Sequence, residues 1–196
     1  MNAFYRIIPG VSTRIFEPYH KHQICTILDN VIRAAIHEAG HAVVGVAYGY
    51  HIRYILLGKD RESAPNSVAR VVRSGGDFGE HNVKVAGYIA ERLWQRKPVE
   101  VGTFRTDPRY GTDRDGLPDK AVPLAFQQAE SVLLANEKKL FTLAEFLEKN
   151  LGRRVETDEV LKILGVWCEG DEYVTKDFLF HHNCASAHGN IAPQPD

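Results

Sequence analysis

The sequence predicts a mostly α-helical α+β domain that contains a small β-sheet. Apolar residues recur at three- and four-residue steps over 29–48, over 82–95 and beyond Pro118, which is the period of an amphipathic helix. Two short runs of apolar and β-branched residues, 52–57 and 67–72, are separated by glycine and proline turn signals and predict adjacent strands. The length of 196 residues fits one main domain.

The two helices predicted in the first half have clear end signals. Gly49 follows the first helical segment and provides a C-cap. The second segment follows the pair Gly75-Gly76 and ends before Pro98, because proline cannot continue a helix. Residues 98–118 are rich in Gly, Pro, Asp and Thr. They predict a long irregular connection, a kind of segment that often carries functional side chains.

The second half predicts further helices. No glycine interrupts the apolar spacing between Pro118 and Gly152, which favours one long helix or a helical hairpin. Residues 160–164 predict a short helix with Thr157 as its N-cap, and residues 173–180 predict a strand.

These elements divide the chain into three parts. We expect an N-terminal lead-in over 1–25, a folded domain over 26–168, and a partly flexible C-terminal extension over 169–196.

Composition and charge restrict the expected partners and compartment. Lys and Arg total 24 against 25 Asp and Glu, a formal net charge of -1, so no bulk attraction to nucleic acid or to an anionic membrane is expected. The three cysteines, Cys25, Cys168 and Cys184, form no paired spacing and favour a reducing compartment. The sequence contains no apolar stretch near 18 residues long. We therefore expect a cytoplasmic protein.

The motif H-E-x-x-H occurs inside the first predicted helix, as His37-Glu38-Ala39-Gly40-His41. Residues four apart lie on one helix face, so the imidazoles of His37 and His41 can converge on one Zn²⁺. Glu38 then lies beside the metal, where a carboxylate can accept a proton from a water whose pKa the metal lowers to roughly 7. This pattern predicts a hydrolytic zinc site with Glu38 as the catalytic residue.

The helix around this motif resembles the active-site helix of the FtsH family of ATP-dependent zinc proteases, over Ile36 to Val44 and the hexad H-E-A-G-H-A. Three further segments are similar to that family in the same order. Residues 86–91 resemble its G-G-R-A-A-E helix, residues 111–115 its G-A-S-x-D segment, and residues 133–160 its closing helices. The resemblance spans residues 30–164.

This resemblance implies a zinc metallopeptidase that hydrolyses peptide bonds in unfolded or flexible polypeptides. It places the third zinc ligand at Asp115, by aligning Gly111 with the glycine of G-A-S-x-D. Asp113, two residues earlier, is the alternative ligand, because Gly116 and Pro118 can shift the local turn.

The nucleotide-binding module of the FtsH family has no counterpart in this sequence. Gly58-Lys59 is followed by Asp60, so the phosphate-binding loop pattern is missing. We therefore expect peptidase activity that is independent of ATP. Whether the chains assemble into a homo-oligomer stays open.

Other functions compete with this interpretation. The chain could be a zinc-binding regulatory module without turnover, although a purely structural site would not need Glu38. It could also be a regulatory protease dedicated to one protein partner. A rival metallopeptidase class, the aspzincins, has the signature G-T-x-D-x-x-Y-G, but Arg114 stands where that pattern needs aspartate.

Two further groups of residues carry alternative interpretations. Glu91, on the second predicted helix, is either a hydrogen-bond support for the zinc ligands or a solvated side chain. His181, His182, Cys184 and His188 could bind a second metal, but their spacing matches no known tetrahedral site, and a solvated tail is favoured.

Overall fold

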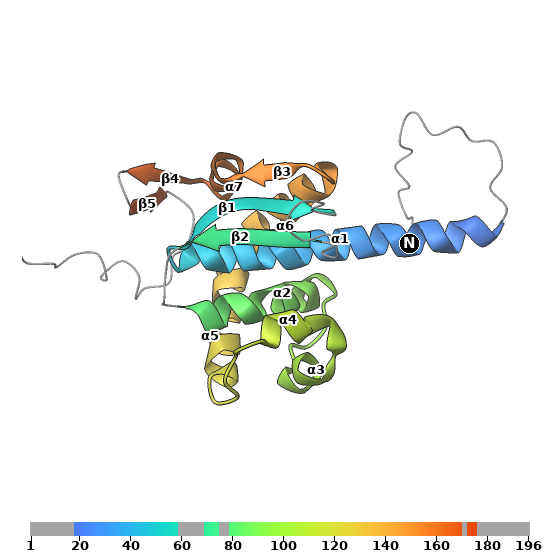
Figure 1. Ribbon diagram of the computed structural model, residues 1–196, viewed down its shortest axis with the longest axis horizontal. Helices are drawn as coiled ribbons and strands as arrows, with labels where there is room; N and C mark the ends of the chain where they lie inside the picture. The colour runs from blue at the N-terminus through green and yellow to red at the C-terminus, as the bar shows by residue number, and fades with distance from the viewer. Residues whose placement is uncertain (1–17, 59–68, 75–78, 170–171, 176–196) are drawn as a thin grey trace, which may run out of the picture.

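The computed structural model describes residues 18–58, 69–74, 79–169 and 172–175 (Figure 1). It confirms the predicted mostly helical α+β class. The helices are α1 (Pro18–Ala47), α2 (Glu80–Trp94), α3 (Val101–Thr106), the 3-10 helix η1 (Pro108–Tyr110), α4 (Gly111–Arg114), α5 (Val122–Ala135), α6 (Glu137–Lys149) and α7 (Thr157–Leu164). The strands are β1 (His51–Leu57), β2 (Ala69–Ser74), β3 (Arg154–Glu156), β4 (Val166–Glu169) and β5 (Glu172–Thr175).

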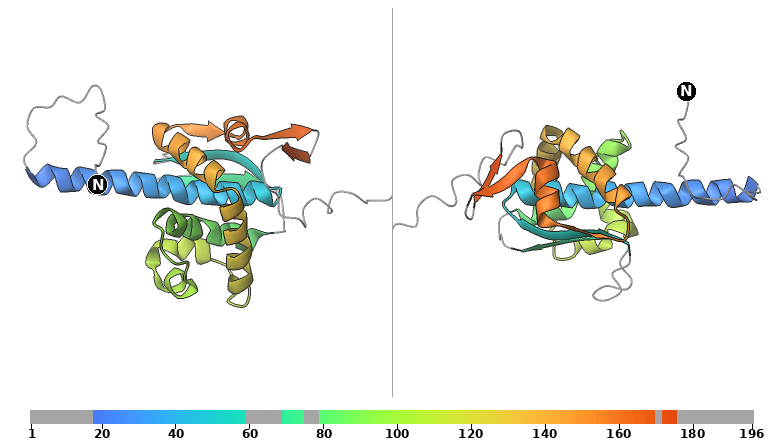
Figure 2. Two further views of the ribbon diagram at one scale, coloured as in Figure 1. Left: turned by 180° about the vertical axis from the view of Figure 1, so that it is seen from behind. Right: turned by 90° about the horizontal axis from the view of Figure 1, so that it is seen from above.

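Helix α1 forms the middle layer of the structure. A three-stranded antiparallel sheet with the order β2-β1-β3 lies on one side of it, and α2 with the short helices α3 and α4 lies on the other (Figure 1). Strands β4 and β5 form a separate antiparallel pair. The N-terminal part of α1 projects beyond the other described elements (Figure 2).

The core of the domain collects on both faces of α1. Its residues Ala39, Ala42 and Val43 are fully buried, as the apolar period of this segment predicts. The helix is followed by Gly49, whose φ of 77° is a left-handed conformation that glycine adopts at little cost. The chain then turns directly into β1, where Ile52 and Ile55 are also fully buried.

Gly40 allows α1 and α2 to approach closely. A Cβ at Gly40 would lie 2.7 Å from the Ala86 carbonyl oxygen and 2.7 Å from the Ala90 Cβ. Contacts this short are essentially never tolerated, so only glycine fits at this crossing. The two helices that carry the candidate site are therefore held at a distance set by this glycine.

The structure differs from the sequence-based expectations near the N-terminus and in the loop. Helix α1 begins at Pro18, so part of the predicted lead-in over 1–25 is helical. The predicted irregular connection over 98–118 contains α3, η1 and α4. These helices are each six residues or fewer, too short to give a periodic apolar signal.

The second half also departs from the expectations in detail. The helical hairpin alternative holds, since α5 and α6 are separated at Asn136. Thr157 is the first residue of α7 and Glu156 is its N-cap, in a capping box with Glu159. Strands β3 and β4 are additional elements. Strand β5 covers the start of the strand predicted over 173–180, whose residues from 176 onward lie outside the described residues.

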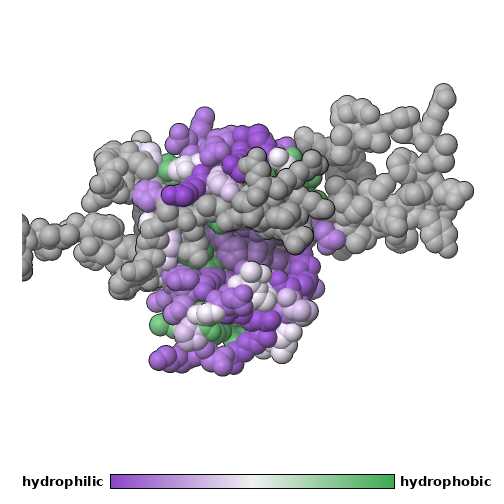
Figure 3. Space-filling model, viewed as in Figure 1, coloured by the Kyte–Doolittle hydropathy of each residue, from purple (hydrophilic) through white to green (hydrophobic). Residues whose placement is uncertain are grey.

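The described surface visible in Figure 3 is mainly hydrophilic, with small hydrophobic areas. Within the described ranges, no helix combines the length and the apolar character needed to span a lipid bilayer. Most of the predicted C-terminal extension lies outside the described residues.

We predict that Gly40→Ala lowers the free energy of unfolding by about 1–3 kcal/mol, the usual range for overpacking a close contact. Urea unfolding monitored by circular dichroism measures this change. Gly102→Ala in α3 is the matched control, because a Cβ there has nothing within 4 Å, and alanine favours a helix by up to about 1 kcal/mol. An unchanged urea midpoint for Gly40→Ala would contradict the close helix crossing.

Candidate metal centre

Three side chains meet between α1 and α4. The His37 Nε2 atom lies 3.2 Å from Oδ2 of Asp113, and the His41 Nε2 atom lies 3.6 Å from Oδ1 of the same carboxylate. The two Nε2 atoms are 2.9 Å apart. One potential ligand atom from each residue lies within 4.8 Å of the other two. These three residues could hold one metal ion, as the spacing of the two histidines predicts.

Each histidine is oriented by a hydrogen bond from its other ring nitrogen. His37 Nδ1 donates to Glu91 Oε1 at 2.9 Å, and His41 Nδ1 donates to the Val83 carbonyl at 2.6 Å. A carbonyl can only accept, and the carboxylate accepts when ionised. Each ring therefore carries a proton on Nδ1, and its Nε2 atom faces the shared point.

This geometry fits a cation. Two Nε2 lone pairs this close would repel each other unless a proton or a metal ion lies with them. Burial lowers the pKa of His37, but hydrogen bonds to Asp113 and Glu91 outweigh it and raise the pKa to about 10. The surroundings of His37 thus favour positive charge. Two imidazole nitrogens and one carboxylate oxygen are also a typical donor set for a hydrolytic metal site.

Asp113 comes from the short helix α4 within the connection over 98–118. Burial raises the pKa of Asp113, but a hydrogen bond to His37 and the charge of His41 hold it below its usual range. Arg114 anchors this segment by donating to three backbone carbonyls of the preceding turn, those of Phe104 at 2.7 Å, Arg105 at 2.6 Å and Asp107 at 3.0 Å. The position of Asp113 is therefore held by its neighbour in sequence.

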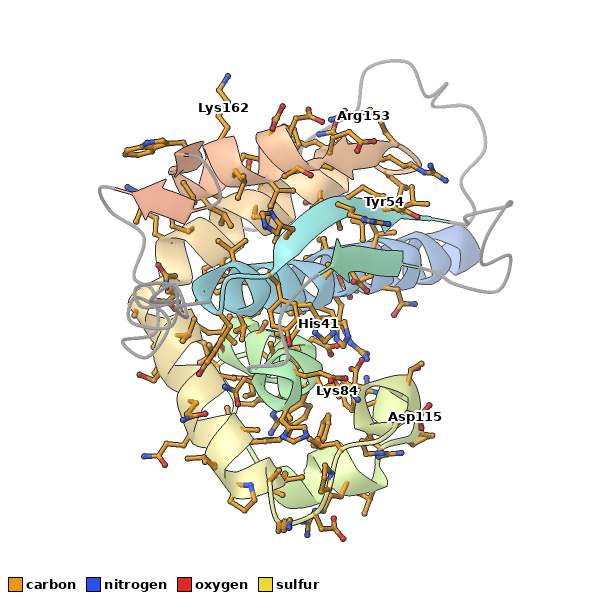
Figure 4. The ribbon with its side chains drawn as sticks, turned by 60° about the vertical axis from the view of Figure 1, so that its left-hand side comes forward. His41, Tyr54, Lys84, Asp115, Arg153 and Lys162 are labelled. Carbon is orange, nitrogen blue, oxygen red and sulfur yellow. The ribbon has the colours of Figure 1, made fainter. Side chains whose placement is uncertain are left out.

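Asp115, the residue that the family register assigns as third ligand, is not part of this cluster. Its side chain is exposed, and Figure 4 shows it at the outer edge of the molecule, away from His41. Its backbone carbonyl accepts a hydrogen bond from Lys84 Nζ at 2.6 Å. The α4 turn instead brings Asp113, the alternative, to the two histidines. The helical turn then ends at Arg114, so Asp115 lies beyond it.

Glu38 occupies the position that the motif predicts, beside the two histidines on α1. It is only 8% exposed. Burial raises the pKa of Glu38 to about 7, with the negative charge of Asp113 acting in the same direction, while His37 and a backbone hydrogen bond from Val71 oppose the shift. A carboxyl group with a pKa near neutrality can both accept and release a proton.

Glu91 supports the site, which confirms one of its two sequence-based interpretations. It is 3% exposed and accepts from His37, Arg33 and Tyr110. Burial raises the pKa of Glu91, but the hydrogen bond and charge of His37 and the charge of Arg33 outweigh this effect. The pKa of Glu91 therefore lies below its usual range. Glu91 is therefore ionised at neutral pH.

Sequence reasoning did not identify Arg33, Tyr110 or Gly87. Arg33 stands four residues before His37, on the same helix face, and this spacing is the signal that could have identified it. Gly87 leaves room for the His37 ring, since a Cβ there would lie 2.5 Å from the ring atoms Cε1 and Nε2. Tyr110 has no comparable sequence signal.

The second candidate cluster, His181, His182, Cys184 and His188, lies outside the described residues. Comparisons of the chain with protein-family models, with curated proteins and with solved structures found no match. The assignment of function therefore depends on the geometry and chemistry of the site.

We predict that Asp113→Ala abolishes tight metal binding and that Asp115→Ala retains it. Only Asp113 contributes a side-chain oxygen to the cluster, whereas alanine at position 115 keeps the backbone carbonyl that Lys84 contacts. Metal content after loading with Zn²⁺ and gel filtration measures the difference. If Asp113→Ala retained zinc and Asp115→Ala lost it, Asp115 would be the third ligand, as the family register predicts.

Proposed function

We propose that this protein is a zinc-dependent metallopeptidase that hydrolyses peptide bonds in flexible polypeptides. The observation that carries the proposal is the position of Glu38, a buried glutamate adjacent to a converged His37, His41 and Asp113 cluster. Its pKa of about 7 suits proton transfer in both directions. A purely structural metal site does not need a proton-transferring carboxyl group.

The donor set supports zinc as the metal. Neutral imidazole nitrogens and one carboxylate oxygen are the ligands of many hydrolytic Zn²⁺ sites, which keep a further position open to solvent or substrate. When bound, Zn²⁺ would lower the pKa of a water molecule and polarise the scissile carbonyl. His37, His41 and Asp113 would hold the ion, and Glu91 and Val83 keep the two rings oriented toward it.

Glu38 performs the proton transfers of the proposed reaction. It accepts a proton from the attacking water as the new carbon–oxygen bond forms at the scissile carbonyl. It then donates that proton to the amide nitrogen as the carbon–nitrogen bond breaks. The products are a carboxylic acid and an amine, and the glutamate returns to its starting state.

The edge of the sheet supports a polypeptide as substrate. Strand β2 is at one end of the order β2-β1-β3, and its residue Val71 contributes a backbone hydrogen bond to Glu38. An extended peptide can add to an exposed strand edge through main-chain hydrogen bonds. A peptide bound along β2 would place its backbone next to Glu38, and only a flexible segment can adopt this conformation.

We predict that Glu38→Gln lowers the rate of peptide hydrolysis by at least about 100-fold, the usual contribution of a general base. Zinc content and the urea midpoint should stay close to those of the wild type, because Glu38 is not one of the three ligands. A fluorogenic casein assay with parallel metal analysis measures both quantities. Wild-type activity in the glutamine variant would exclude this catalytic role.

We predict that the wild-type protein degrades casein and leaves a tightly folded test protein intact. The physical reason is that a compact substrate offers no extended segment, and this chain has no phosphate-binding loop to couple ATP hydrolysis to unfolding. Gel-based assays with and without ATP measure the two rates. The proposal of ATP independence fails if ATP accelerates cleavage or if the folded protein is degraded.

A further inference from the structure

Glu91 joins the three segments that build the candidate metal centre. It lies on α2 and accepts three hydrogen bonds, from His37 Nδ1 at 2.9 Å, from Arg33 Nε at 2.5 Å and from the Tyr110 hydroxyl at 2.8 Å. Arg33 and His37 are on α1, whereas Tyr110 ends η1, three residues before Asp113. One buried carboxylate thus connects the helix of the histidines to the segment of the aspartate.

We propose that Arg33 and Tyr110 are positioning residues that act through Glu91 on the metal ligands. They fix the carboxylate so that it holds the His37 Nδ1–H and directs Nε2 toward the ion. This inference rests on the metal site of the proposed function. It adds to that function a network that determines how tightly the ion is held.

The charge of Arg33 stabilises this arrangement. An ionised carboxylate that is 3% exposed is costly unless a cation or several donors satisfy it. Arg33 supplies the positive charge from one turn before His37 and is itself partly buried, with 24% of its side chain exposed. Without Arg33, Glu91 would keep His37 and Tyr110 as donors and would lose the charge of the guanidinium.

The ring of Tyr110 restricts His37 from a second direction. The two rings are stacked, with centroids 6.1 Å apart and an interplanar angle of 13°. Gly87 lies against the His37 ring on α2. The hydrogen bond, the stacked ring and the glycine together leave little freedom for His37 to rotate.

Tyr110 also links His37 to Asp113. The hydroxyl of Tyr110 is anchored on Glu91, and α4 starts at the next residue, Gly111. Because Arg114 ties the other end of this helical turn to the preceding backbone, the turn is held on both sides. Loss of the Tyr110 hydroxyl would therefore loosen the approach of Asp113 as well as the orientation of His37.

The test is the affinity of the full chain for Zn²⁺, measured by competition with a chromophoric chelator. We expect Arg33→Gln and Tyr110→Phe each to weaken binding by about 10- to 100-fold, the range for outer hydrogen-bond partners of metal ligands. Combining Tyr110→Phe with Glu91→Gln should weaken binding by much less than the product of the two single effects, because the hydroxyl acts through Glu91.

Tyr88→Phe is the matched control for the loss of a buried tyrosine hydroxyl. Tyr88 packs edge-on against Tyr110 with ring centroids 4.9 Å apart, but its hydroxyl donates to the Glu100 carbonyl at 2.9 Å and contacts none of the ligands. The Tyr88→Phe variant should bind zinc as tightly as the wild type, even if its urea midpoint is lower. Arg92→Gln on α2 is the control for loss of an arginine, since Arg92 Nε donates to the Pro98 carbonyl.

A spectroscopic readout separates positioning from general stability. The ¹⁵N resonances of the His37 imidazole should show a proton on Nδ1 in the zinc-loaded wild type and in Tyr88→Phe. In Arg33→Gln and Tyr110→Phe, this signal should broaden or shift as the ring loses its fixed partner.

The inference is overturned if Arg33→Gln and Tyr110→Phe bind zinc as tightly as the wild type, or if Tyr88→Phe loses as much affinity as Tyr110→Phe. Binding is measured without hydrolysis, so the two proposals fail separately. A wild-type chain that binds zinc but hydrolyses no peptide substrate would remove the peptidase proposal and leave the positioning network standing. A wild-type chain that binds no zinc would overturn both.

Discussion

The close crossing of α1 and α2 is the constraint on which the site depends. Gly40 brings the helix of the two histidines against the backbone of Ala86, and Gly87 makes room for the His37 ring on the facing helix. At this separation Glu91 and the Val83 carbonyl can each reach a histidine Nδ1. Larger side chains at these glycines would move the two rings away from the partners that orient them.

Helix α1 presents different chemistry to its two neighbours. Toward α2 and α4 it directs the imidazoles and Arg33, which are paired with carboxylates. Toward the sheet it directs Glu38, which has a backbone partner at Val71 and is otherwise desolvated. The candidate metal ligands and Glu38 thus lie within about one turn of the same helix, but the surroundings of His37 favour positive charge and those of Glu38 favour its neutral form. This contrast underlies the proposed hydrolytic function.

Sequence predicted the local part of this arrangement and missed the part that depends on three-dimensional contacts. Helical spacing alone predicted that His37 and His41 share a face, because that relation is fixed by the backbone period. The choice between Asp113 and Asp115 depended on where a four-residue helix begins and ends. The family register favoured Asp115, whereas the helical turn places Asp113 beside the histidines. Glu91 had two equal interpretations, since its burial is decided by Arg33 and Tyr110, residues 58 and 19 positions away along the chain.

The most direct test of the metal centre is a crystal structure of the zinc-loaded protein with anomalous data collected at the zinc absorption edge. We predict one strong anomalous peak in contact with Nε2 of His37, Nε2 of His41 and a carboxylate oxygen of Asp113, with no fourth protein ligand. Absence of a peak at this position would contradict the central claim. A peak bound by four protein side chains would contradict it as well, because a closed site leaves no position for a reacting water.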